Sequence, residues 1–136
     1  MTLRIREAAR IIGLSADTLR YYEKIHLVPQ PARGVGGQRA YSDRDLARLR
    51  FVVRAQALGF SLQEIGQLLR FRANPARSSR SVRRLARRKC DALAAQRQAL
   101  EHTYRELSLL LNLCTAAGDH CPILERLDGA SVNHGT

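Results

Sequence analysis

The stretch from Val82 to Leu113 constrains the fold of this chain most, because it contains neither proline nor glycine. Leu93, Leu100 and Leu107 recur every seven residues within it, a spacing that gives a long helix one apolar stripe. The companion positions carry Cys90, Tyr104 and Leu111, with Arg97 as a break in the row. A lone helix cannot bury such a stripe, so we expect a homodimer built on an antiparallel coiled coil. The alternative is that the stripe folds back on the chain's own N-terminal part.

The N-terminal part shows the pattern of a helix, a glycine turn and a second helix. Apolar residues from Ala8 to Leu14 have helical spacing around Gly13, and Ser15 can cap a second helix that runs through Thr18 and Leu19. This pattern predicts a helix-turn-helix, whose second helix can enter the major groove of DNA.

Residues 28–41 contain two prolines and three glycines before an extended run, which predicts a β-hairpin wing. Ser42 with Asp45, and Ser61 with Glu64, have capping-box spacing and predict two further helices. Residues 71–80 hold a proline, an asparagine and two serines, so we expect a hinge there.

These elements predict a mainly α protein with three parts. Residues 1–74 form a winged helix-turn-helix DNA-binding domain, and residues 75–113 form the hinge and the dimerisation helix. Residues 114–136 carry Cys114 and Cys121, candidate ligands for a metal ion, so we expect a metal-sensing loop with a short helix and a tail there. The chain is too short for two independent domains with sizeable cores.

The charge of the chain is concentrated in its first part. The net charge is +11, and residues 1–90 carry 20 Lys and Arg against 6 Asp and Glu. Clustered cations of this kind favour double-stranded DNA as the partner, although they also occur on solvated surfaces. No apolar run reaches the roughly 20 residues of a membrane span, so we expect a cytoplasmic protein without a membrane partner.

Several side chains of the predicted second helix can donate hydrogen bonds to phosphates or base edges. They are Thr18, Arg20, Tyr21 and Lys24. Arg33 and Arg39 add positive charge from the wing. Tyr21 and Tyr22 are adjacent and point to different helix faces, so we expect only one of them to lie in the core.

Two cysteines near the C-terminus can converge on one ion. Cys114 and Cys121 flank a loop containing Gly118, and Pro122 suits the first position of a short helix. Cys121 would then be the N-cap, where the positive helix end lowers the pKa of its thiol. Two thiolates favour soft ions such as Cu(I), whereas thiophilic divalent ions need further ligands.

Three segments resemble the N-terminal domain of MerR-type transcription activators: DTLRYYEKIHLVPQPAR, RAYSDRDLARLRFV and ALGFSLQEIGQLL. The similarity continues through the hinge, the long helix and the cysteine loop. It implies a homodimer on a palindromic operator between promoter elements that are spaced too far apart. Activation then comes from bending and untwisting the DNA so that RNA polymerase engages both elements.

The resemblance also assigns DNA contacts to individual residues. Arg20 and Tyr21 match positions at which the recognition helix touches DNA. Arg33, Arg39 and Tyr41 match positions at which the wing touches the backbone.

The same resemblance bears on the choice of metal. Divalent sensors of this family place a third cysteine near the start of the partner's long helix, whereas this chain has Ser78 and Ser79 there. Ser79 aligns with a serine of the copper, silver and gold sensors, and Arg83 aligns with a basic residue that would offset the negative charge of a Cu(I)-dithiolate site. These matches predict Cu(I), or alternatively Ag(I).

Other features favour a divalent ion. The cysteine loop has the length found in some cadmium and lead sensors, and His120 offers a nitrogen ligand, which keeps Zn(II), Cd(II), Pb(II) and Hg(II) as alternatives. Cys90 lies about 16 Å along a helix from Ser79, which favours a role in the dimer seam over one as a third ligand.

Rival functions remain on the same sequence. One is a sensor in which a single cysteine reacts with an electrophile. Another is an architectural DNA-binding protein with a structural zinc ion. An iron-sulfur sensor would need four clustered cysteines, and no grouping typical of an enzyme is present, so we expect no enzymatic activity.

Overall fold

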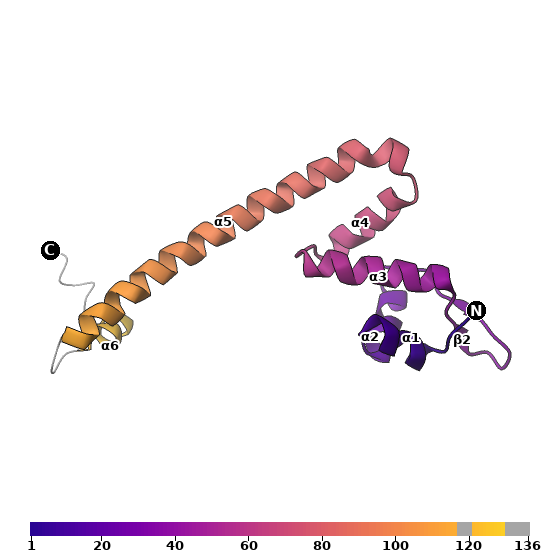
Figure 1. The fold of residues 1–136 in the computed structure, drawn as a ribbon, viewed down its shortest axis with the longest axis horizontal. Helices are drawn as coiled ribbons and strands as arrows, with labels where there is room; N and C mark the ends of the chain where they lie inside the picture. The colour runs from indigo at the N-terminus through magenta and orange to yellow at the C-terminus, as the bar shows by residue number, and fades with distance from the viewer. Residues whose placement is uncertain (117–120, 130–136) are drawn as a thin grey trace. The chain divides into compact units, whose positions relative to one another are not determined.

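The computed structural model describes residues 1–116 and 121–129 (Figure 1). It contains helices and one two-stranded sheet, in two compact units, one from Met1 to Lys89 and one from Cys90 onward. The elements in order are α1 (Ile5–Ile12), α2 (Ala16–Lys24), β1 (Ala32–Arg33), β2 (Arg39–Ala40), α3 (Asp43–Ala57), α4 (Leu62–Arg72), α5 (Pro75–Ala116) and α6 (Pro122–Leu127). The prediction of a mainly α chain with a winged head and one long helix is confirmed.

The helix-turn-helix is formed by α1 and α2. Gly13 ends α1 with a φ of 86°, in the left-handed region that a residue with a side chain adopts only under strain. The Ser15 side chain then accepts a hydrogen bond from the backbone N–H of Thr18 and caps α2. A single residue, Leu14, therefore separates the end of one helix from the cap of the next.

The wing is the antiparallel pair of β1 and β2, in which Ala32 faces Ala40 and Arg33 faces Arg39. Its turn contains Gly36 and Gly37, both with positive φ. Next to the wing, the backbones of Leu3 and Tyr41 exchange two hydrogen bonds of 2.9 and 2.8 Å. This bridge fixes the segment that leads into α1 beside the base of the wing.

The core of the head lies between α1, α2, α3 and α4. Both predicted capping boxes are present, at Ser42 for α3 and at Ser61 for α4. The largest fully buried side chains are Leu19, Leu49, Val52 and Ile65, one from α2, two from α3 and one from α4. Leu19 thus anchors α2 in the same core that holds the other helices.

The predicted hinge over residues 71–80 is wrong in extent, because only Ala73 and Asn74 separate α4 from α5. Pro75 is the first residue of α5. Proline has no backbone N–H, but the first N–H of a helix has no partner within the helix, so no hydrogen bond is lost. Leu85 of α5 is buried, and Lys89 forms a 2.9 Å ion pair with Glu64 of α4. The first turns of α5 therefore belong to the head.

The second unit contains the remainder of α5 and α6. The helix α5 continues to Ala116, three residues past position 113, where the dimerisation helix was predicted to end. No helix within the described residues is long and apolar enough to cross a membrane.

Replacing Leu49 by Ala should lower the free energy of unfolding by about 2–5 kcal/mol, because the change leaves a cavity in the core. Leu49 is 2% exposed, whereas Leu58 at the end of α3 is 66% exposed. Urea unfolding at one fixed protein concentration would measure the effect, with Leu58→Ala as the matched control. Equal losses in the two variants would contradict this description of the core.

Candidate DNA interface and thiol site

The outward face of α2 carries three side chains that were predicted to contact DNA. Arg20, Tyr21 and Lys24 are exposed. Lys24 lies four residues after Arg20 and three after Tyr21, about one helical turn, so the three side chains share the solvent-facing side of the helix. Tyr22 lies on the opposite side, buried, and its hydroxyl is 3.1 Å from the side-chain oxygen of Gln56, to which it donates. The expectation that only one of the two tyrosines lies in the core is confirmed.

Two of the predicted contacts on α2 already have partners within the helix. The Thr18 hydroxyl lies 2.8 Å from the Ser15 hydroxyl, within the cap of α2. Arg20 donates to Asp17 over 2.8 Å. Both interactions are exposed, and an exposed ion pair contributes little, so Arg20 can exchange Asp17 for a phosphate or a base at small cost.

Tyr41 does not lie on the surface where the wing was expected to touch the DNA backbone. Its side chain is buried, and its hydroxyl donates to Glu23 Oε2 over 3.2 Å. Burial, together with the nearby carboxylate, raises the pKa of Tyr41 to about 12. The prediction of a DNA contact by Tyr41 is therefore corrected, because the phenol is part of the core.

Glu23, near the end of α2, connects this helix to the wing through hydrogen bonds from Arg39 and Tyr41. It was not singled out from the sequence. Its carboxylate is buried and accepts a 2.7 Å hydrogen bond from Arg39 Nε, in addition to the one from Tyr41. A buried charge is costly unless it is paired, and Arg39 supplies the pairing charge. Arg39 thus sits partly buried against α2, while its neighbour across the strands, Arg33, is exposed and donates to the Gly37 carbonyl over 3.1 Å.

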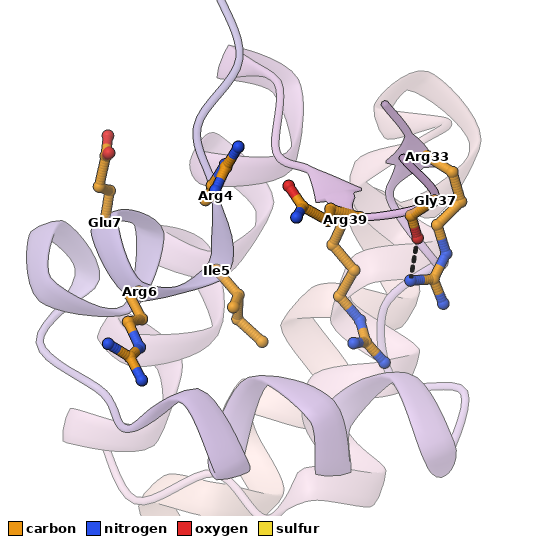
Figure 2. A pocket seen from close by; sticks show the side chains of 8 residues that line it. Arg4, Ile5, Arg6, Glu7, Arg33, Gly37 and Arg39 are labelled. Carbon is orange, nitrogen blue, oxygen red and sulfur yellow. Dashed lines mark hydrogen bonds between the residues drawn. The ribbon is translucent and has the colours of Figure 1, made fainter. Parts of the chain in front are cut away.

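A hollow of about 560 Å³ opens between the start of α1 and the wing (Figure 2). Its lining includes Arg33 and Arg39, which were predicted to contact DNA, and two arginines that were not, Arg4 and Arg6. We call it the basic hollow. The signal that could have revealed these two residues is the presence of positive charge at the first turn of a helix, where acidic residues are favoured.

The two C-terminal cysteines lie together. Cys114 Sγ and Cys121 Sγ are 3.3 Å apart, and both thiols are free. Cys121 is the N-cap of α6 and Pro122 is its first residue, as the sequence predicted. The side chain of Arg126 on α6 forms a 2.8 Å ion pair with Glu106 on α5, so the short helix is tied to the long one.

The two thiols differ in acidity. The backbone N–H of Leu124 and then the Cys114 thiol lower the pKa of Cys121, as expected for a thiol at the start of a helix. The hydrogen bond to Cys121 raises the pKa of Cys114. Cys121 is therefore the first of the pair to become a thiolate, the form that binds metal.

The other residues that the sequence analysis connected with the metal site are exposed on α5 or lie outside the described residues. Ser79 and Arg83 are exposed on α5, as is Cys90, and His120 lies outside the described residues. Within residues 1–116 and 121–129, no group of three His, Cys, Asp or Glu side chains could hold a metal ion. The described donor set is thus the two thiols alone.

Known protein families match both the head and most of the long helix. The sequence matches the family described as "MerR HTH family regulatory protein" over residues 3–72 and the one described as "MerR, DNA binding" over residues 46–110. It is 36% identical to a "Probable heavy metal-dependent transcriptional regulator" of Haemophilus influenzae, over 93% of this chain and all of that protein. It is 39% identical to the transcriptional regulator HmrR of Rhizobium leguminosarum, over 94% of this chain and all of that protein.

A solved structure extends the similarity to the fold. The transcription regulator PbrR691 from Ralstonia metallidurans, in complex with lead(II), superposes with a TM-score of 0.77 at 33% identity. The superposition covers 92% of this chain and 98% of that one. All three of these proteins are described as transcriptional regulators, and none as an enzyme.

Replacing Arg20 by Ala should weaken binding to a DNA duplex that the wild-type protein has selected from a random library. We expect a loss of about 5-fold to 150-fold, since a good side-chain contact to a base contributes about 1–3 kcal/mol. Fluorescence anisotropy would measure the affinity, with Arg54→Ala as a control that removes the same charge from an exposed position on α3. An unchanged affinity would remove Arg20 from the DNA interface.

Proposed function

This chain belongs to the MerR family of helix-turn-helix regulatory proteins, and we propose that it is a metal-responsive transcription activator. It binds a palindromic operator as a homodimer and responds to Cu(I) or Ag(I) at the pair of Cys114 and Cys121. The observation that carries the proposal is the 3.3 Å distance between the two sulfur atoms, one of them at the start of a helix.

The head supplies the DNA-binding surface. Arg20, Tyr21 and Lys24 face outward from α2 and read the major groove, while Thr18 contributes its hydroxyl at the start of that helix. Arg33 and Arg39 of the wing contact the phosphate backbone beside it. Phosphate contacts of this kind set the position of the head on the duplex, and the contacts of α2 to base edges give the specificity.

The apolar stripe of α5 supplies the dimer interface. Leu93, Leu100, Tyr104, Leu107 and Leu111 are between 44% and 72% exposed in the single chain. Burying large side chains of this kind contributes roughly 1.5–3 kcal/mol each, so a second copy that covers the stripe is strongly favoured. The packing is an antiparallel coiled coil, which presents two heads to the two halves of a palindrome.

The thiol pair fits a soft monovalent ion. Two sulfur donors, one with a lowered pKa, suit Cu(I) or Ag(I), and the described residues add no third ligand to them. Cys114 and Cys121 would hold such an ion as thiolates, and its positive charge would offset part of theirs. The tie between Arg126 and Glu106 keeps α6 beside α5.

Ser79 and Arg83 set the selectivity of the site in this proposal. Both are exposed on α5, and we place them across the dimer, beside the other subunit's loop. The partner subunit's Ser79 offers no thiolate to a divalent ion, and the partner subunit's Arg83 offsets the net negative charge of a monovalent ion with two thiolates. His120, in the loop between the cysteines, is the residue that would complete the shell of a divalent ion instead.

The response to the metal is a change in the shape of the operator. A head clamped on each half-site can bend and untwist the DNA between them, which brings overspaced promoter elements into line for RNA polymerase. The deformation is least costly where the centre of the operator is flexible.

Titration of the reduced protein with metals under anaerobic conditions tests this function. Transcription is scored from an overlong-spacer promoter that carries a duplex selected by the protein, with Cu(I), Ag(I), Zn(II), Cd(II), Pb(II) and Hg(II) added separately. Activation by Cu(I) or Ag(I) alone, at one ion per chain, is expected. Activation by Pb(II), the ion bound in the similar structure from Ralstonia metallidurans, or by another divalent ion would overturn the metal assignment but leave the DNA-binding role.

The double substitution Cys114→Ser and Cys121→Ser should abolish the metal response and leave DNA binding unchanged. Cys90→Ser is the matched control, because Cys90 is exposed on α5 away from the pair in sequence, and it should respond as the wild type does. A response that persists without both loop cysteines would eliminate the loop as the sensor.

Leu100→Glu should convert the dimer to a monomer, because it places a charge in the middle of the apolar stripe. Gln98→Glu adds the same side chain on the other side of the helix and should leave the dimer intact. Analytical ultracentrifugation would distinguish the two states. A dimeric Leu100→Glu variant would place the interface elsewhere.

A further inference from the structure

The basic hollow is formed by two segments that lie apart in sequence. Arg4 and Arg6 come from the start of α1, while Arg33, Gln38 and Arg39 come from the wing. In Figure 2 the side chains of Arg6 and Arg39 lie on either side of Ile5. The backbone bridge between Leu3 and Tyr41 holds the two segments together.

The positive charge of the hollow is mostly uncompensated. Arg4, Arg6 and Arg33 are exposed and make no ion pair with any residue in the described part of the chain. Glu7 is the one acidic residue in the lining. Three arginines that repel one another therefore surround a space that suits an anion.

This charge does not serve the stability of α1. A positive side chain at the N-terminal end of a helix opposes the helix dipole, and Arg4 stands at the N-cap without a side-chain cap hydrogen bond. Arg4 and Arg6 therefore destabilise α1 itself. A bound anion would remove that conflict.

One arginine of the hollow is already oriented. Glu23 accepts a hydrogen bond from Arg39 Nε, which leaves the two terminal nitrogens of the guanidinium group for another partner. Guanidinium groups bind phosphate oxygens with two parallel hydrogen bonds when they are held in this way. Glu23 is therefore a positioning residue for Arg39.

We propose that the basic hollow binds a backbone phosphate of the operator, with Arg4 and Arg6 as DNA contacts additional to those of α2 and the wing. This inference rests on the proposed DNA-binding function. The lining favours a DNA phosphate over a small free anion, because Arg4, Arg6 and Arg33 are exposed. Exposed charges bind a single small anion weakly, whereas a duplex that is already held by α2 brings its phosphates to them.

The test measures how DNA affinity depends on salt. The probe is a fluorescein-labelled duplex enriched by the wild-type protein from a random-sequence library, and affinity is measured between 50 and 200 mM KCl. The double variant Arg4→Ala/Arg6→Ala should bind more weakly and should show a shallower slope of log affinity against log salt. The slope should fall by about 0.9 for each phosphate contact that is lost.

Two controls separate a lost contact from a damaged head. Arg4→Lys/Arg6→Lys keeps the charge and should keep most of the slope, whereas Arg54→Ala loses one exposed arginine outside the hollow and should keep all of it. The alanine double variant should unfold at the same temperature as the wild type or higher, since it removes positive charge from the start of a helix.

The outcomes are distinct. A wild-type slope and affinity in Arg4→Ala/Arg6→Ala would overturn the phosphate site and leave the proposed function standing. If the wild-type protein enriches no duplex from the library, the proposed DNA-binding function fails before the variants are compared. Binding of inorganic phosphate to the wild type and to Arg4→Ala/Arg6→Ala is measured in parallel. If the double variant loses phosphate binding but keeps the wild-type DNA slope, the hollow is a small-anion site and the inference is overturned.

Discussion

The arrangement of the DNA-binding head depends on one buried carboxylate. Glu23 lies at the end of the recognition helix and receives hydrogen bonds from Arg39 and Tyr41, which stand at the edge of the wing. Removing one partner of a buried ion pair costs about 3–5 kcal/mol, because the other charge is left without compensation. The angle between α2 and the wing is therefore set by an interaction that is costly to break. In the proposed function, the exposed face of α2 and the arginines of the wing therefore approach DNA as one preformed surface.

The second constraint is the length of α5, which spans Pro75–Ala116. Its first turns bury Leu85 in the head, its middle exposes a row of large apolar side chains, and its last turns carry Cys114. In the proposed dimer this row is covered by the other copy, so the same helix that joins the subunits also holds one of the two sulfur ligands. Pro122 and the N-cap position of Cys121 then bring the second sulfur to the first.

Local sequence signals predicted most of this fold, because caps and turns act over three or four residues. Ser15, Ser42 and Ser61 each start the helix that their spacing predicted, and Cys121 caps α6. The errors arose where a distant residue decides the outcome. Tyr41 was expected on the surface, but its partner Glu23 lies 18 positions earlier in the chain and cannot be inferred from nearby residues. Arg4 and Arg6 carry a local signal in their positive charge at the start of a helix, but only the fold brings the start of α1 beside the wing.

In the proposed function, two thiols and no other group bind a monovalent ion. Copper K-edge X-ray absorption on the protein, loaded anaerobically with one Cu(I) per chain, reports the atoms bound to the ion. Two sulfur scatterers and no nitrogen scatterer are expected, with the same spectrum in Cys90→Ser. A third sulfur, or a nitrogen such as that of His120, would overturn the two-thiolate site and would favour a divalent ion as the effector.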